Sequence, residues 1–183
     1  MRGQKLREFE KKGLCGKTPF IKRIAPHFME KARHNLLFCA AAWGVSSRED
    51  AKKILGLPGD FSAFDWVVIA AYYAMYHAAL AALASVGYKS DNHAATAAAL
   101  EVFFVRKNLL ERKFLDKLKE ARALEEEYAQ TFRRARRQRE TAQYWVTEET
   151  GKDAAEKLLG DARGFVDRIE RLISEIGRKT ENA

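Results

Sequence analysis

The segment 133–139, Arg-Arg-Ala-Arg-Arg-Gln-Arg, lies in a stretch whose apolar residues recur at helical spacing. These apolar residues define one helix face: Ala121, Leu124, Tyr128, Phe132, Ala135 and Ala142. Most of the arginines point away from this face or lie at its edge, as Arg137 and Arg136 do. Arg139 falls within it. An arginine on a buried face is unfavourable unless it meets a carboxylate, a phosphate or a water-filled cleft. Arg139 is therefore a candidate ligand for phosphate, and an ion pair with Asp65 or Glu101 is the structural alternative.

A second group of candidate residues lies on the uncharged segment 66–86, which we expect to be one long helix. Its polar side chains are Tyr72, Tyr73, Tyr76 and His77, and Asp65 stands at its start, where a carboxylate favours the helix dipole. Buried hydroxyl and imidazole groups need hydrogen-bond partners. Each of these residues could be a satisfied core residue, whereas together they are a candidate wall of a binding pocket.

The rest of the chain predicts an all-α fold in a single domain of 183 residues. Alanine is abundant and there are only three prolines, which favours helix almost throughout. We expect further helices at about 27–43, 47–55, 94–107, 111–143 and 148–177, with glycines weakening the start of the last one. Residues 1–20 are polar and broken by glycine and proline, so we expect a loosely ordered arm or a short capping turn there.

The segment 66–86 is long enough to span a bilayer, but its alanines and tyrosines make it only modestly hydrophobic. We therefore expect a buried core helix and no membrane contact. Cys15 and Cys39 show no metal-binding or disulfide spacing, and the N-terminal residues lack a signal-peptide pattern, so we expect a cytoplasmic protein without metal or cofactor. The net charge of +8 permits binding of nucleic acid, nucleotide phosphates or an acidic partner, and equally fits a well-solvated helical surface.

Several of these segments resemble the HEPN superfamily (higher eukaryotes and prokaryotes nucleotide-binding), most closely a small prokaryotic branch of it. The block Tyr72-Tyr73-Ala74-Met75-Tyr76-His77-Ala78-Ala79 is similar to that family's alanine-rich central helix. The segment from Arg139 to Tyr144 resembles an Arg-x-x-Ala-Asp-Tyr motif, with Gln143 in place of the aspartate. The turn 89–93, which ends in His93, the opening segment 6–10 and the closing helix from Phe165 also fit the branch.

The resemblance implies a bundle of four to five main helices with short extra helices on the N-terminal side, usually in a homodimer. It also implies a partner, a minimal nucleotidyltransferase, with which such proteins form a toxin–antitoxin pair. In active members an Arg-x4-6-His motif makes the protein a metal-independent ribonuclease, in which arginine stabilises phosphate charge and histidine transfers a proton.

No histidine follows the arginines of segment 133–139 here, and Tyr144 takes the motif position. A tyrosine with an ordinary pKa of about 10 is a poor base at pH 7. The leading hypothesis is therefore a non-catalytic or weakly catalytic protein that binds nucleotide or RNA. The alternatives are a ribonuclease toxin in which Tyr144 or His77 acts with Arg139, and a plain protein-interaction module. We expect the ligand to contact mainly these side chains: Asp65, Tyr72, Tyr73, Tyr76, His77, His93, Arg136, Arg137 and Arg139.

Overall fold

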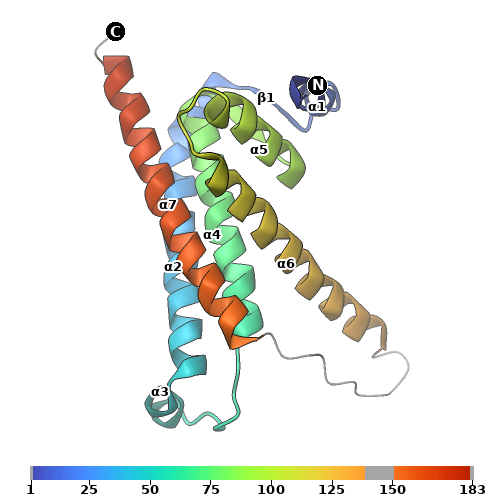
Figure 1. The fold of residues 1–183 in the computed structure, drawn as a ribbon, viewed down its shortest axis with the longest axis vertical. Helices are drawn as coiled ribbons and strands as arrows, with labels where there is room; N and C mark the ends of the chain where they lie inside the picture. Colours follow the sequence, from blue (N-terminus) through green and yellow to red (C-terminus); the bar gives the residue numbers. More distant parts are fainter. Residues whose placement is uncertain (1, 139–150, 182–183) are drawn as a thin grey trace.

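The computed structural model describes residues 2–138 and 151–181, and these residues are almost entirely helical. Four long helices make up the bundle: α2 (Ala25–Ser47), α4 (Phe64–Ser85), α6 (Arg112–Gln138) and α7 (Lys152–Glu181). Helices α2 and α6 run in one direction, and α4 and α7 run in the other (Figure 1). α6 crosses α4 obliquely and diverges from it towards its C-terminal end. The predicted all-α, up-and-down bundle is therefore confirmed.

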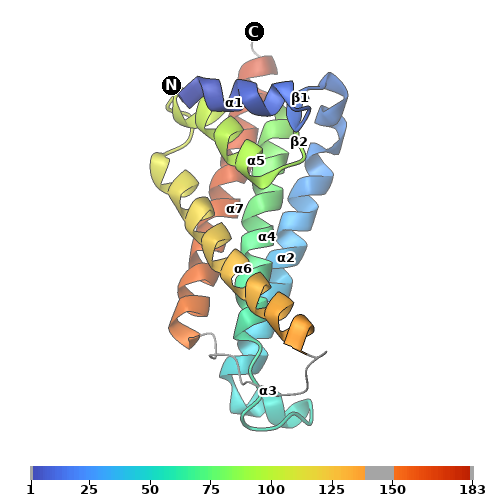
Figure 2. The ribbon, with the colours of Figure 1, turned by 90° about the vertical axis from the view of Figure 1, so that its right-hand side faces the viewer.

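Shorter elements cover the ends of this bundle: α1 (Arg2–Lys11), β1 (Cys15–Lys17), the 3-10 helix η1 (Pro19–Ile24), α3 (Glu49–Ile54), β2 (Tyr88–Ser90), α5 (His93–Leu100) and the π-helix η2 (Glu101–Val105). Strands β1 and β2 pair antiparallel, with Cys15 opposite Ser90. α1 lies across the end of the bundle beside α5 (Figure 2). Residues 2–17 thus contain a helix and a paired strand where a loosely ordered arm or a short capping turn was expected, and main-chain hydrogen bonds tie β1 to β2.

Helix α4 is the centre of the core, as the sequence predicted. Its alanines at every fourth position, Ala70, Ala74, Ala78 and Ala82, are at most 5% exposed. α4 packs most extensively against α2, whose buried side chains are mostly small. Among the described residues, α4 is also the one helix long and apolar enough to cross a membrane, but 78% of its most apolar window is buried inside the protein. Small side chains on both helices allow their backbones to approach closely, and the uncharged segment is core.

Two helices differ from those expected. α2 continues through Gly44 to Ser47, and the Ser46 hydroxyl both donates to the Ala42 carbonyl (2.8 Å) and accepts from the Ala63 amide (2.9 Å). α7 continues without a break through Gly160 and Gly164, because the apolar residues around these glycines are buried against α4. Tertiary packing outweighs the low helix propensity of glycine at these positions.

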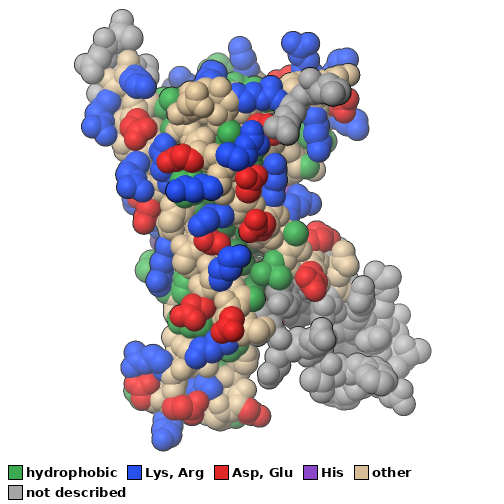
Figure 3. All heavy atoms as spheres, in the orientation of Figure 1, with side chains coloured by type: hydrophobic (Ala, Val, Ile, Leu, Met, Phe, Trp, Pro, Cys, Tyr) green, Lys and Arg blue, Asp and Glu red, His purple; other side chains and the backbone are tan. Residues whose placement is uncertain are grey.

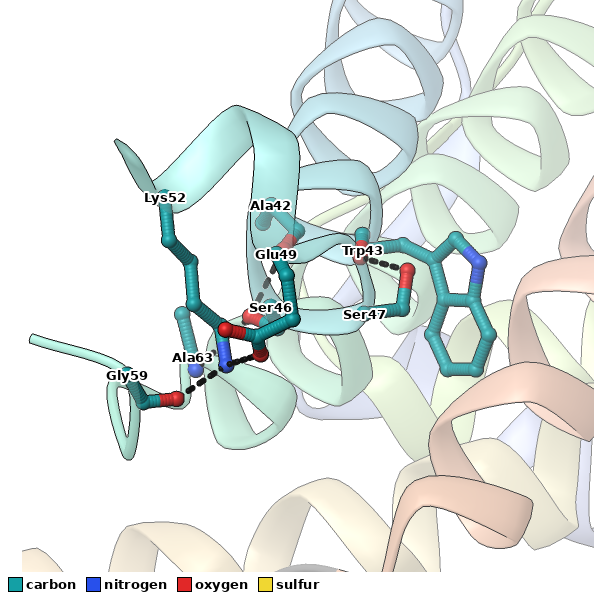
Figure 4. Close-up of polar contacts among 8 residues, drawn as sticks. All are labelled: Ala42, Trp43, Ser46, Ser47, Glu49, Lys52, Gly59 and Ala63. Atoms are coloured by element: carbon teal, nitrogen blue, oxygen red, sulfur yellow. Dashed lines mark hydrogen bonds and ion pairs between the residues drawn. The ribbon is translucent and has the colours of Figure 1, made fainter. Parts of the chain in front are cut away.

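Lys52 closes the loop between α3 and α4 (Figure 4). It is buried although it carries a charge, and its ammonium donates to the Gly59 carbonyl (2.5 Å) and to Glu49 Oε1 (3.0 Å). A buried lysine needs such acceptors, since the unpaired charge would be costly to desolvate. These two hydrogen bonds fix the loop that leads into the central helix.

We expect Lys52→Met to lower the free energy of unfolding by about 1 kcal/mol, because the aliphatic stem is retained while the hydrogen bond to Gly59 is lost. Urea denaturation measures this change. The neighbouring exposed Lys53 provides the control, since Lys53→Met removes the same charge without a described hydrogen bond. Equal destabilisation by the two substitutions would show that Lys52 does not act through these contacts.

Candidate functional site

A partly open cavity of about 280 Å³ lies where α1, α4, α5 and α6 meet. The residues that line it come from all four helices and from the π-helix η2 that follows α5: Lys5, Tyr72, Tyr76, His93, Ala94, Ala97, Ala98, Glu101, Leu118, Lys119 and Arg122. Figure 2 shows α6 passing in front of α4, with α5 and α1 above the crossing. Three of the residues predicted from the sequence, Tyr72, Tyr76 and His93, are therefore brought together in one cavity.

Aromatic rings form one wall of this cavity. The Tyr76 and His93 rings lie with their centroids 4.2 Å apart and their planes inclined by 32°. Tyr72 and Tyr76 are stacked, with centroids 6.0 Å apart and an interplanar angle of 20°. The Tyr72 hydroxyl is hydrogen-bonded to His93 Nδ1, which fixes the imidazole against the tyrosines. Such a wall offers flat π-faces on which a nucleobase can stack.

His93 is held in place by the turn that starts α5. The Asn92 side chain caps this helix by accepting hydrogen bonds from the Ala94 (2.9 Å) and Ala95 (3.1 Å) amides. The buried Thr96 hydroxyl donates to Ser90 Oγ, 2.9 Å away, and so ties the first turn of α5 to strand β2. His93 is thus the first residue of a capped helix, and its position follows from local sequence.

Arg122 of α6 brings a positive charge to the aromatic wall. Its Nη1 atom is excluded from solvent and has no hydrogen-bond partner among the described residues. A buried donor without an acceptor is destabilising, and guanidinium groups bind phosphate oxygens strongly. Because Arg122 also lines the cavity, its guanidinium group is the feature that most directly indicates an anionic ligand.

Burial and the Arg122 charge determine the protonation states around the cavity. Burial lowers the pKa of His93 below its usual 6.5, and the Arg122 charge lowers it further, while Glu126 opposes both effects. Burial raises the pKa of Tyr72 and of Tyr76 above 10. At pH 7 the imidazole is therefore neutral, and both phenols remain hydrogen-bond donors. The cavity can bind a base on its aromatic wall and a phosphate on Arg122. The described residues contain no cluster suited to a metal ion.

Other predicted site residues lie elsewhere. His77 Nδ1 is 2.8 Å from the Tyr73 carbonyl oxygen and 3.1 Å from Asn35 Nδ2, on a face of α4 that looks towards α2. Asp65 stays at the start of α4, where its carboxylate accepts a hydrogen bond from the Trp66 amide (2.9 Å). The structure therefore does not place Asp65, Tyr73 or His77 among the residues that line the cavity.

The predicted arginines cannot be placed in this site. Arg139 and Tyr144 lie outside the described residues, and the side chains of Arg136 and Arg137 also lie outside them. Glu101, a suggested partner for Arg139, has ionic contacts with Arg112 (3.4 Å) and Arg106 (3.9 Å).

Arg122 was not among the predicted site residues, although the sequence contains a signal for it. Leu115, Leu118 and Arg122 follow the same three- and four-residue spacing that singled out Arg139. Both leucines are buried, so Arg122 continues an apolar stripe of α6. Lys5 and Lys119 were also missed, because nothing in their local sequence distinguishes them from other surface lysines.

These observations define the class of protein: an all-α bundle with a cavity against its central helix that contains aromatic residues and an arginine. The family model described as "HEPN domain" matches residues 59–172, which is more than half of the chain. The chain therefore belongs to the HEPN domain family, and this membership associates it with nucleotide- or RNA-related functions. No individual curated protein matches it. The matched segment contains α4, α5, α6 and most of α7, whereas α1 and α2 precede it.

The two part-buried histidines predict a stability that decreases in acid. Burial lowers the pKa of His77 and of His93 below 6.5, so the unfolded chain binds protons that the folded chain does not bind. The contribution of these two histidines to the free energy of unfolding is therefore fully present above the unfolded-state pKa of about 6.5. It is lost as the pH falls from this value towards the lower pKa values of the folded state. We expect Tm to be lower at pH 5.5 than at pH 7.5, by a shift on the order of a few degrees.

Calorimetry of the His77→Gln/His93→Gln double variant tests the cause. The difference between the two pH values should shrink in this variant and persist in His34→Gln, which changes an exposed histidine. A pH dependence that is the same in all three proteins would exclude the two part-buried imidazoles as its origin.

Proposed function

We propose that this HEPN protein binds a nucleotide, free or as part of an RNA, in the cavity between α1, α4, α5 and α6. The observation that carries the proposal is Arg122, which lies beside the Tyr76–His93 wall and whose buried Nη1 atom has no hydrogen-bond partner in the part of the chain that the structure describes. A phosphate oxygen would bind the guanidinium group of Arg122, which lines the cavity, and a base would stack on the aromatic rings. Both halves of a nucleotide thus have a complementary surface in one cavity.

The charge distribution supports a role for the cavity beyond that of general surface charge. On the face shown in Figure 3, basic side chains are interspersed with acidic ones and form no continuous stripe. The net charge of +8 would attract phosphate-bearing molecules at long range. Selective binding then depends on the cavity, where Arg122 lies with aromatic, apolar and other charged side chains.

We further propose that the protein is non-catalytic or weakly catalytic, forms a homodimer and pairs with a minimal nucleotidyltransferase. The first part is supported by the sequence, in which none of the four histidines follows the arginine run of residues 133–139. The homodimer and the nucleotidyltransferase rest on the family resemblance of the Tyr72–Ala79 and Arg139–Tyr144 segments. Light scattering of the purified protein tests the dimer, and co-purification with the product of a neighbouring gene tests the pair.

Isothermal titration calorimetry with AMP, adenosine and inorganic phosphate tests the binding site. We expect AMP to bind more tightly than either adenosine or phosphate, because only AMP engages both the aromatic wall and Arg122. Tyr76→Leu should weaken AMP and adenosine together while leaving phosphate binding unchanged. Absence of AMP binding at low ionic strength, or phosphate binding as tight as that of AMP, would contradict the proposal.

A further inference from the structure

A second cavity of about 470 Å³ adjoins the aromatic one. The two share Lys5, Ala98, Glu101 and Lys119, and the second adds only Arg112 and Asp116. It has no aromatic residue, and charged side chains make up most of its lining. The two cavities therefore form one continuous depression with an aromatic end and a polar end.

Two of the three cations of the polar end are available to a ligand. Arg112 is partly neutralised by its contact with Glu101 (3.4 Å). Lys5 and Lys119 are exposed, and neither has an ion pair with another described residue. Both also line the aromatic cavity, so these two lysines lie at the junction of the two compartments.

Lys5 comes from α1, a helix that precedes the segment matched by the family model. α1 is nevertheless anchored to the site. The Leu6 side chain is only 5% exposed, and α1 packs beside α5. At the C-terminal end of α1, Glu10 Oε1 accepts a hydrogen bond from the Tyr88 hydroxyl (2.9 Å). The Asp91 amide in turn donates to the Leu14 carbonyl (3.0 Å). The same β2–α5 turn thus fixes both His93 and the helix that carries Lys5.

We propose that the polar cavity is a subsite for a second phosphate of the ligand, and that α1 completes it by supplying Lys5. The inference rests on the nucleotide site proposed above and adds the class of ligand. With the base on the Tyr76–His93 wall and the first phosphate on Arg122, the next phosphate enters the polar cavity and meets Lys5 and Lys119. That phosphate is either the β-phosphate of a nucleoside diphosphate or the next phosphodiester of an RNA, since both present the same anionic oxygens to an ammonium group.

Calorimetric titrations with AMP, ADP and the 5′-phosphorylated dinucleotide pApA test the subsite. We expect ADP, pApA or both to bind about tenfold more tightly than AMP to the unaltered protein. A gain with ADP alone identifies a free nucleotide as the ligand, and a gain with pApA alone identifies RNA. In Lys5→Gln the gain over AMP should fall to about twofold or threefold. Lys12→Gln, which changes an exposed lysine just after α1 that lines neither cavity, should retain the full gain.

The outcomes separate this inference from the proposed function. Binding of AMP with no gain from a second phosphate overturns the subsite and leaves the nucleotide site intact. A gain that is the same in Lys5→Gln as in the unaltered protein overturns the role of α1. No binding of any of the three ligands overturns both proposals.

Discussion

Replacing Arg122 by glutamine is expected to weaken AMP binding by about 10- to 100-fold. A hydrogen bond to a charged group contributes about 1.5–3 kcal/mol, and each 1.4 kcal/mol corresponds to a factor of ten in affinity. The Nη1 atom of Arg122 is excluded from solvent and has no hydrogen-bond partner among the described residues, so its interaction with a ligand phosphate would not replace an internal one. The loss should therefore appear fully in the measured dissociation constant.

The stability of the same variant distinguishes a ligand-binding residue from a structural one. In the empty protein, the unpaired Nη1 donor is a cost to folding. We therefore expect Arg122→Gln to leave Tm unchanged or to raise it while affinity falls, as is common at sites where function is retained at the expense of stability. A fall in Tm together with a loss of affinity would indicate that Arg122 supports the fold instead.

Arg171→Gln is the matched control for charge. Arg171 is an exposed residue of α7 that lines neither cavity, so its replacement removes one positive charge without touching the site. Calorimetry at low ionic strength should show little change in AMP affinity for this variant. If both arginine variants lose affinity equally, the attraction comes from the net charge and not from the cavity.

The fold was predictable from the sequence because one physical signal dominates it. The uncharged, alanine-rich segment 66–86 has no polar face to expose, so it had to be buried, and the structure places it at the centre of the bundle as α4. The paired strands were not predicted. β1 and β2 have three residues each, and their pairing depends on main-chain hydrogen bonds between segments more than 70 residues apart. Such contacts leave little trace in side-chain periodicity.

The site was predictable only in part. Tyr72 and Tyr76 could be expected to share a pocket wall, because they are one turn apart on a buried helix. The periodicity of α4 alone could not separate them from Tyr73 and His77, since that separation depends on where α5 and α6 cross α4. A charged residue on an apolar stripe needs a partner, and this requirement holds for Arg122 as it does for Arg139. The contribution of Lys5 depends on how α1 docks on α5, which is a tertiary contact.

The segment matched by the family model and the helices that precede it contribute different things to the cavity. The family match covers the helices that carry the aromatic wall and Arg122, and it excludes α1 and α2. α2 contributes core packing against α4, whereas α1 contributes Lys5 to the lining of both cavities. A change in α1 could therefore alter which ligands are preferred without disturbing the core of the bundle.

Substituting leucine for Ala78 is expected to destabilise the protein by about 2–3 kcal/mol, because the larger side chain has no space to enter. Ala78 is completely buried in α4, the helix that packs against α2, α6 and α7. The facing helix α2 also buries small residues, among them Ala32 and Cys39, both fully inaccessible. Added volume at this position must separate the helices or force strained rotamers, since protein interiors are already close-packed.

Urea denaturation followed by circular dichroism measures the effect, and Ala41→Leu serves as the control. Ala41 lies on the exposed face of α2, so the same substitution there changes helix propensity only slightly and adds no volume to the core. We expect a large fall in the denaturation midpoint for Ala78→Leu and almost none for Ala41→Leu. A fully stable Ala78→Leu protein would mean that α4 is not tightly enclosed, and the uncharged segment would then need another explanation, such as contact with a membrane or a second chain.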